Sequence, residues 1–478
     1  MIVIVLGIIV PKIFITSYGS DINGLLSTIS QIFTYMALLE AGIGQAAQNA
    51  LYGPVKENDK DGIIHVVSVA KSYFKRLTWV YGTGVILLAV LIPFVLKTNV
   101  DRTTVILIVL LEGMSDVFSF FFIQTPSVLL AVSGKSYINN EISVINKIAG
   151  YATKIILASA GANIVLLQFA YFVIVILKVV FYEWYIRKNY QWLKYEKTKA
   201  SDKLPDRNAY VLTEVAWTIF SSTDMIVLSS FLSTEMASVY SIYAMIFTNI
   251  NLLVNGVFGS IKYLLGYAYH EGVKEYERMH DAFNSTFLGI MTILMSVAYV
   301  LTLPFIRLYT SGITDANYIY ESLPMMFCLV QIISWSRYVS GNLTGIAGYA
   351  KKTSYVSLIE ALLNVVLSIL LVNRFGIVGV LFATVISLPI KVVWCTYISD
   401  VKIMKRSIWK TISILSVNYL LFAGVVVISK VIPLEVNSYG QFLVYGLVLS
   451  AVIGIVGTVA NVLVNKECLR VIRRLFHR

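Results

Sequence analysis

Apolar residues run in long segments along this chain, separated by short polar connections. A hydrocarbon core roughly 30 Å thick needs about 20 apolar residues for each helical span, and fourteen segments approach or reach that length. The segments do not alternate apolar and polar residues as the strands of a membrane barrel do. They predict an all-α polytopic membrane protein with about 14 transmembrane helices. The predicted spans cover residues 1–17, 24–50, 78–96, 103–131, 138–158, 163–185, 208–232, 237–261, 282–304, 321–346, 353–372, 376–398, 411–429 and 439–464.

The basic residues of the connections predict how the spans are oriented. If the connection after the second span is cytoplasmic, the connections on that side and the C-terminal tail contain 27 Lys and Arg, against 5 on the opposite side. Connections rich in Lys and Arg stay in the cytoplasm. We therefore expect both termini and the basic stretch 187–207 on the cytoplasmic side of the membrane.

Composition narrows the classes of function. Of the 478 residues, 58% are hydrophobic and 13% charged, whereas soluble domains have about 45–50% and about 25%. This composition excludes a soluble enzyme. The formal net charge of +12 comes mostly from the cytoplasmic connections, so no nucleic-acid partner is expected. Three widely spaced cysteines and four histidines predict neither a disulfide framework nor a metal site.

An internal repeat relates the two halves of the chain at an offset of 214 residues. Residues 31–34 (QIFT) correspond to residues 245–248 (MIFT), and further matches keep this register over much of both halves. Near the end of the repeat, Lys178 corresponds to Lys391 at an offset of 213 residues. Six spans separate equivalent elements, so both halves have the same orientation and the repeat is parallel.

The repeat predicts two six-helix lobes around a substrate site near the midplane, and two additional C-terminal helices. With only short connections between the spans, this arrangement favours transport by alternating access over chemistry. The predicted organisation is an N-lobe at 1–186, a basic cytoplasmic linker at 187–207, a C-lobe at 208–400, and two further spans with a basic cytoplasmic tail at 401–478.

Short motifs in both halves resemble a known family. They are LEAGIG at 39–44, STDMIVLS at 222–229, EALLN at 360–364 and FGIVGV at 375–380. In this order they resemble the Wzx-type polysaccharide flippases of the multidrug/oligosaccharidyl-lipid/polysaccharide exporter superfamily. The resemblance covers nearly the whole chain and implies the same two-lobe, MATE-like fold that the repeat predicts.

The resemblance also implies a function. The expected substrate is an undecaprenyl-diphosphate-linked oligosaccharide repeat unit, moved across the bacterial cytoplasmic membrane for capsule, O-antigen or exopolysaccharide assembly. Polysaccharide assembly proteins are then candidate partners beside the lipid bilayer. Family members usually carry a segment before the first span, whereas this chain begins directly in an apolar run, without a signal-peptide pattern. We therefore expect a short preceding segment to be missing here.

Basic residues inside the spans are the candidate substrate contacts, because a diphosphate cannot cross a hydrocarbon core unpaired. Lys12 follows Pro11 in the first span, and its alternative role is to extend to the outer interface. Arg337 suits bidentate phosphate binding, and its alternative is a structural pair with Glu360. Lys147 and Lys154 are two helical turns apart on one face of the fifth span. This face must contact either water or side chains of opposite charge. Their candidate partners are Glu112 and Asp116, which share a face of the fourth span.

Acidic residues inside the seventh span are candidates for ion coupling. Asp224 and Glu214 have no adjacent basic residue in the sequence, and a buried carboxyl could exchange a proton or Na⁺ for substrate. The alternative for Asp224 is a packing role with a partner in another helix. Apart from such a proton or Na⁺ gradient, no cofactor is expected.

Other functions remain open at this stage. A lipid II flippase and a MATE-like drug or cation antiporter belong to the same superfamily. A drug exporter for cations should favour acids in its cavity, whereas basic residues also lie in the spans here. A membrane polysaccharide polymerase needs a large outer loop or a catalytic domain, and the outer connections are short. No catalytic residues are therefore predicted.

Overall fold

The computed structural model describes residues 2–40, 43–196, 207–432 and 434–469. Within these residues the regular elements are helices, and no strand occurs among them. The chain divides into two compact units, Met1–Ser238 and Val239–Arg478. The helices of the first unit are α1 (Ile2–Ala37), η1 (Leu38–Glu40), α2 (Ile43–Lys56), α3 (Lys60–Val95), α4 (Arg102–Phe122), α5 (Gln124–Val132), α6 (Ser136–Ser159), α7 (Ile164–Asn189) and α8 (Arg207–Phe231).

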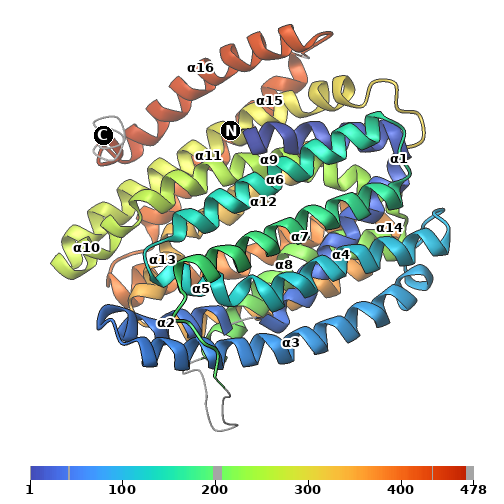
Figure 1. The fold of residues 1–478 in the computed structure, drawn as a ribbon. Coiled ribbons are helices and arrows are strands. Elements are labelled where there is room, and N and C mark those ends of the chain that lie inside the picture. Colours follow the sequence, from blue (N-terminus) through green and yellow to red (C-terminus); the bar gives the residue numbers. More distant parts are fainter. Residues whose placement is uncertain (1, 41–42, 197–206, 433, 470–478) are drawn as a thin grey trace. The chain divides into compact units, whose positions relative to one another are not determined.

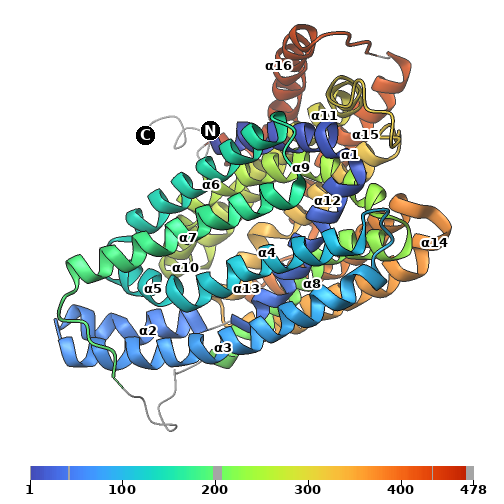
Figure 2. The same ribbon diagram turned by 45° about the vertical axis from the view of Figure 1, so that its right-hand side comes forward.

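The second unit begins within α9 and continues to the C-terminal helices (Figures 1 and 2). Its elements are α9 (Thr234–Ile261), α10 (Tyr263–Glu271), α11 (Val273–Tyr309), α12 (Leu323–Ser336), α13 (Tyr338–Ile346), α14 (Ala350–Tyr397), the π-helical η2 (Ile398–Ile403), α15 (Trp409–Val431) and α16 (Tyr439–Val464).

The predicted apolar segments correspond to these helices. Nine helices in the described part of the chain are long and apolar enough to cross a membrane by themselves. The remaining segments fall on helices that are charged, such as α6 with Lys147 and Lys154, or interrupted, such as α12 and α13. The prediction of an all-α polytopic membrane protein is confirmed.

Two long helices, α1 and α14, are each divided into two segments by a glycine with positive φ. At Gly376 the backbone has φ 59° and ψ −139°, and α14 folds back on itself there. The amide of Asn364 donates to the Thr384 hydroxyl at 2.8 Å, although the two residues would lie about 30 Å apart in a straight helix. Gly19 in α1, with φ 85°, likewise separates two helical segments. Only glycine adopts such dihedrals without strain, so both breaks depend on these positions.

The two segments of α1 have different neighbours in the first unit. The segment before Gly19 runs alongside α6, and the Tyr18 hydroxyl donates to the Ala162 carbonyl oxygen just beyond α6 at 2.7 Å. The segment after Gly19 packs against α8 in antiparallel orientation. The same segment closely approaches the start of α9, because a Cβ on Gly24 would overlap the backbone carbonyl of Thr234.

This packing places α8 in the first compact unit, although α8 opens the second half of the repeat. The C-lobe prediction of 208–400 follows the repeat, whereas the compact units follow side-chain packing. Near the end of α8, the Ser229 hydroxyl lies 2.5 Å from the hydroxyl of Thr28. The helix that follows the linker therefore helps to build the unit that precedes it.

In the second unit, α11 is the central helix and packs against α12, α15 and α16. The two C-terminal helices are joined by a buried pair of amides, Asn418 and Asn461, with N···O distances of 2.9 and 3.2 Å. Buried polar side chains inside a membrane protein need such partners, since lipid offers none. The pair fixes the rotation of α15 against α16.

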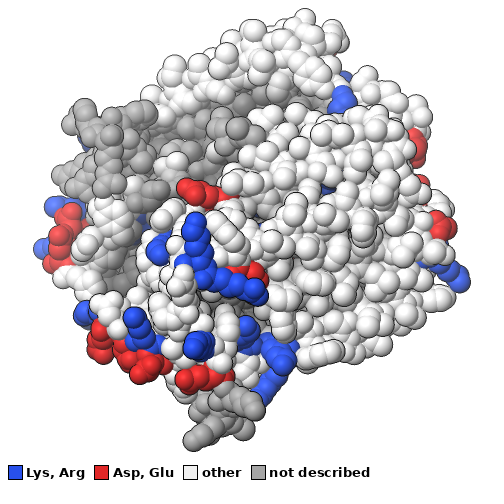
Figure 3. Space-filling model, viewed as in Figure 1, with Lys and Arg blue, Asp and Glu red and all other residues white. Residues whose placement is uncertain are grey.

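Charged side chains of the first unit gather at one end of its helices. Figure 3 shows Lys and Arg around the region where α2 ends and α3 begins, and the exposed residues there include Lys56 and Lys60. The surface farther along α3 carries exposed apolar side chains such as Trp79, Leu87 and Phe94 instead. This division is typical of a helix that passes from an aqueous end into lipid.

Candidate functional site

A partly polar cavity of about 290 Å³ lies inside the first unit. Five helices supply its walls: both segments of α1, with α4, α6, α7 and α8. Its polar lining combines hydroxyls and amides with one acid and one base. The lining residues are Val10, Pro11, Phe14, Asn23, Leu26, Ser27, Ser30, Gln31, Glu112, Lys154, Gln168 and Met225.

Lys154 is the basic side chain among the described residues that line this cavity. Its ammonium lies 4.3 Å from the ring centroid of Tyr171 and 5.9 Å from that of Phe14. These aromatic faces stabilise the cation without neutralising it. Glu112 lines the same cavity and interacts electrostatically with Lys154, so these two of the predicted partners face one cavity.

The polar wall of the cavity comes from one face of α1. Asn23, Ser27, Ser30 and Gln31 follow the i, i+4, i+7, i+8 spacing of a single helical face. The Asn23 amide donates to the Ser238 hydroxyl at 2.8 Å, which anchors one end of this face. These four residues were not predicted as site residues, although their helical spacing within an apolar span is a signal in the sequence.

Gln168 supplies a hydrogen-bond acceptor from α7. Its side chain is 3% exposed and lines the cavity, and its Oε1 has no hydrogen-bond partner among the described residues. A buried acceptor without a partner is costly unless water or a ligand satisfies it. The cavity thus offers both a cation and neutral polar groups to a ligand.

The other predicted cations lie elsewhere in the structure. Lys12 is half-buried on α1 next to Pro11, but it is not among the described residues that line the cavity. Lys147 lies on α6 with an exposed side chain, so the structure does not bring it together with Lys154. Of the two lysines predicted to share one face, only the one nearer the C-terminal end of α6 reaches the cavity.

Arg337 forms the alternative interaction that the sequence suggested. Its guanidinium donates to the Glu360 carboxylate, and the side chains of the pair are 12% and 3% exposed. Lys391, the repeat equivalent of Lys178, interacts electrostatically with both members. The structure therefore places Arg337 in a buried charge cluster of the second unit.

The predicted coupling acids both lie on α8. Asp224 is buried, with 7% of its surface exposed, and it interacts electrostatically with Tyr35 of α1. Its neighbour Thr223 shares a hydrogen bond with the Tyr35 hydroxyl, and the next residue, Met225, lines the cavity. The Glu214 side chain lies outside the described residues.

Two further acids of the first unit have partners away from Lys154. Asp116 accepts a hydrogen bond from the Tyr81 hydroxyl at 2.7 Å, and Glu40 accepts one from the Gln124 amide at 3.1 Å. Asp116 thus has a hydrogen-bond partner on α3. The two acids connect η1, α3, α4 and α5 through polar contacts.

A buried ionic cluster in the second unit had no local signal in the sequence. Arg406 donates to Asp281 through both terminal nitrogens, at 2.6 and 2.9 Å, and through Nε to Asp400 at 2.7 Å. Burial lowers the pKa of Arg406, but the hydrogen bonds and charges of the two carboxylates outweigh this and raise it above its ordinary value. Arg406 therefore stays charged and ties α11 and η2 to the start of α15.

An apolar groove of about 440 Å³ also lies in the second unit, mainly between α15 and α16. Its lining includes Leu420, Leu421 and Val425 of α15, with Val452 and Val456 of α16. Ser429 is the hydroxyl-bearing side chain among the described residues that line it. The groove suits a long hydrocarbon chain.

Comparisons with known proteins identify the fold. No known family profile matches the chain, and no curated protein matches its sequence. Among solved structures, it is similar to the lipid II flippase MurJ in an inward closed conformation, with a TM-score of 0.69 at 15% identity, covering 95% of this chain and 96% of MurJ.

Two multidrug transporters are also similar in structure. An inward-facing multidrug resistance MATE family transporter of the MOP superfamily gives a TM-score of 0.68 at 14% identity, covering 82% of this chain and 93% of the transporter. The MATE multidrug transporter DinF-BH gives 0.61 at 15% identity, covering 85% and 94%. The chain therefore has the MurJ/MATE-like fold, as the repeat and the resemblance predicted.

Proposed function

We propose that this protein is a flippase that moves undecaprenyl-diphosphate-linked oligosaccharide repeat units across the bacterial cytoplasmic membrane by alternating access. Lys154 in the cavity of the first unit carries the proposal. A diphosphate needs a cation and hydrogen-bond donors wherever it leaves water, because an unpaired charge in a low-dielectric site is costly. The cavity combines this cation with the Asn23, Ser27 and Ser30 side chains.

The size of the cavity suits the diphosphate group rather than a whole glycan. Ligand pockets commonly span about 300–1,000 Å³, and this one lies at the lower limit with about 290 Å³. Lys154 would contact the phosphate oxygens as a mobile point charge. Glu112 beside it limits how strongly the anion is held, which favours release after transport.

The apolar groove between α15 and α16 supports a lipid-linked substrate. A polyprenyl chain needs a continuous apolar surface, and the groove residues are almost entirely aliphatic. Its volume of about 440 Å³ accommodates part of such a chain. The two helices stand outside the predicted repeat, so this surface is an addition to the basic two-lobe plan.

A lipid II flippase is the second candidate. Similarity to MurJ extends over 95% of this chain, whereas the two MATE transporters cover 82% and 85%. For a lipid-linked substrate of either kind, the cavity and the apolar groove would serve in the same way.

Ion coupling is the second part of the proposal. Asp224 is buried on α8 beside Thr223 and Met225, and Met225 lines the cavity. A carboxyl there would take up a proton or Na⁺ as substrate leaves and so draw on the membrane gradient. Polysaccharide assembly proteins would then receive the flipped unit on the outer face.

The central test replaces Lys154 and uses Lys147 as a matched control. Both lysines lie on α6, but Lys147 is exposed and outside the cavity. We expect K154A to reduce surface-polysaccharide export at least about tenfold, because losing one charge-assisted contact costs about 1.5–3 kcal/mol. K147A should export at the wild-type level. Export is measured on cells with matched amounts of protein in the membrane.

Three results would count against the proposal. Wild-type export by K154A would remove the cationic cavity from the mechanism. Equal loss of export in both variants would show that α6 tolerates neither substitution, and the loss in K154A would then not indicate a role for the cavity. Normal polysaccharide but blocked lipid II translocation in K154A would move the assignment to the second candidate.

A further inference from the structure

A second pocket of about 470 Å³ opens at the end of the first unit opposite the α2–α3 connection. Three connections form it: the turn at Gly19, the α3–α4 loop and the α6–α7 loop. In the orientation predicted from the basic residues, all three lie on the outer side of the membrane. Its lining residues are Tyr18, Asp21, Ile22, Asn99, Val100, Asp101, Thr104, Asn163 and Ile164.

The shape of this pocket is fixed by hydrogen bonds of Asp21. Its carboxylate accepts from the Thr98 hydroxyl at 2.9 Å and from the Asn99 backbone N–H at 2.7 Å, and it also accepts from the Thr234 hydroxyl. These bonds connect α1, the α3–α4 loop and the start of α9. Asp21 therefore positions the α3–α4 loop, and the other lining residues of the pocket are available to contact a ligand.

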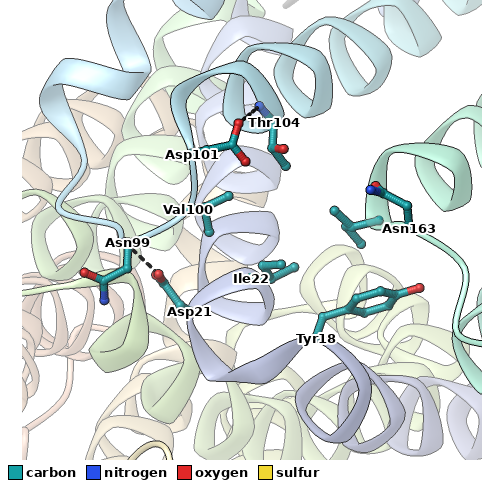
Figure 4. Close-up of a pocket in the computed structure, with 9 residues that line it drawn as sticks. Tyr18, Asp21, Ile22, Asn99, Val100, Asp101, Thr104 and Asn163 are labelled. Atoms are coloured by element: carbon teal, nitrogen blue, oxygen red, sulfur yellow. Dashed lines mark hydrogen bonds between the residues drawn. The ribbon is translucent and has the colours of Figure 1, made fainter.

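The remaining lining combines an apolar floor with a polar rim. Figure 4 shows Ile22 and Val100 between Asp101 on one side and Asn163 on the other, with the Tyr18 ring nearby. The Asn163 Oδ1 accepts from the Val165 backbone N–H at 2.8 Å, and its amide nitrogen carries two further donors. An aromatic and aliphatic floor beneath amide and carboxylate groups matches a sugar ring, which has C–H faces and hydroxyl edges.

The charge of the pocket selects among sugars. Asp21 and Asp101 line it, and hydrogen bonds from Thr104 hold the pKa of Asp101 below its ordinary value, so this carboxylate stays ionised at neutral pH. The nearest basic residues in the sequence have other contacts. Lys97 donates to the Phe231 carbonyl oxygen at 2.5 Å, and the Arg102 guanidinium lies 4.8 Å from the Phe94 ring centroid.

We infer that this pocket binds neutral or amino-sugar rings of a glycan on the outer side of the membrane and rejects uronic acids. The inference rests on the proposed function and specifies its substrate class. The rim donates and accepts hydrogen bonds, whereas the two carboxylates repel an anionic ring. A sugar held there after the diphosphate has left the inner cavity would delay return of the substrate.

The test measures binding of soluble trisaccharides to the purified full-length chain in a detergent without a sugar headgroup. Saturation-transfer NMR is applied to maltotriose, a glucosamine trimer and a galacturonate trimer. We expect signals from the first two and none from the third. Y18L should weaken maltotriose binding at least about fivefold, whereas Y18F, which keeps the ring, should not. N437A alters an exposed asparagine of the α15–α16 connection as a control and should bind normally.

The D101N variant tests the charge argument. Asparagine also caps helix N-termini, so α4 should remain intact. We expect D101N to bind the galacturonate trimer, with maltotriose binding within about twofold of wild type. Unchanged maltotriose binding in Y18L, or binding of galacturonate by the wild type, would overturn the inference. Calcium binding that D101N abolishes, without any saccharide signal, would also overturn it and identify a cation site.

Export measured on the same variants separates this inference from the proposed function. If no trisaccharide binds but K154A still blocks export, only the sugar pocket is wrong. If the trisaccharides bind as expected but K154A exports normally, the proposed function is wrong and the pocket stands.

Discussion

At the scale of single residues, three charged side chains of the second unit form a cluster. Arg337 donates to Glu360, and Lys391 interacts electrostatically with both. In this largely buried site, the carboxylate of Glu360 lies beside both bases. Breaking a buried pair from one side costs about 3–5 kcal/mol, because it leaves an uncompensated charge. We therefore expect substitutions of its three members to lower the free energy of unfolding by different amounts.

Replacing Glu360 should be more damaging than replacing Arg337. E360Q leaves two cations facing each other, whereas R337Q leaves Glu360 with Lys391 as an opposite charge. We expect E360Q to lower the free energy of unfolding by about 3–5 kcal/mol and R337Q by clearly less. Unfolding in detergent micelles followed by circular dichroism measures both.

R187Q serves as the control for this pair. Arg187 and Glu183 lie 3.3 Å apart with side chains 82% and 35% exposed, and such pairs contribute little. R187Q should therefore unfold like the wild type. If R337Q proved as damaging as E360Q, Lys391 would not act as a partner of Glu360.

At the scale of elements, the contact between α1 and the start of α9 depends on the absence of a side chain. A Cβ on Gly24 would overlap the Thr234 carbonyl oxygen and lie 2.8 Å from the Ser238 backbone nitrogen, both of α9. Both atoms belong to the backbone, so no rotation of a side chain relieves the overlap. The same segment of α1 carries the polar wall of the cavity, and helix separation would therefore open it.

In the G24A variant, the helices of the first unit should no longer pack closely. We expect a lowered midpoint of thermal unfolding in micelles and little export. G53A is the matched control, because Gly53 lies within α2 and a Cβ there meets nothing within 4 Å. Alanine at this position should be neutral or stabilise the helix by up to about 1 kcal/mol. Equal behaviour of the two variants would contradict the close approach of α1 to the start of α9.

The helices were largely predictable from the sequence, whereas their partners were not. Apolar length alone located the spans, and the turn of α14 at Gly376 lies beside the predicted short connection at residues 373–376. Periodicity put Lys147 and Lys154 on one face, but only the neighbouring helices decide that Lys154 reaches a cavity. Arg406 and Asp281 are 125 residues apart, and no local pattern connects them.

At the scale of the whole molecule, the distribution of basic residues predicts orientation in the membrane. The 27 Lys and Arg of one set of connections contrast with 5 in the other. The cysteines of the described chain, Cys328, Cys395 and Cys468, are all buried. Newly introduced cysteines can therefore be labelled over a low background.

Labelling of two single-cysteine variants tests the orientation. Lys274 and Asn437 are both exposed in the predicted connections of the second unit, and they belong to opposite sets. A membrane-impermeant maleimide should label N437C on intact cells and K274C only after lysis. The reverse pattern would invert the topology and place the sugar pocket in the cytoplasm.

The position of α8 has a consequence for the continuity of the chain. The basic linker precedes α8, yet α8 supplies Met225 to the cavity and packs along α1. A protein cleaved in the linker would yield a first fragment that lacks one wall of its own cavity. During synthesis, the first unit likewise cannot close until the ribosome has passed residue 231, the end of α8. The two halves of the repeat are thus joined by a shared helix as well as by a peptide bond.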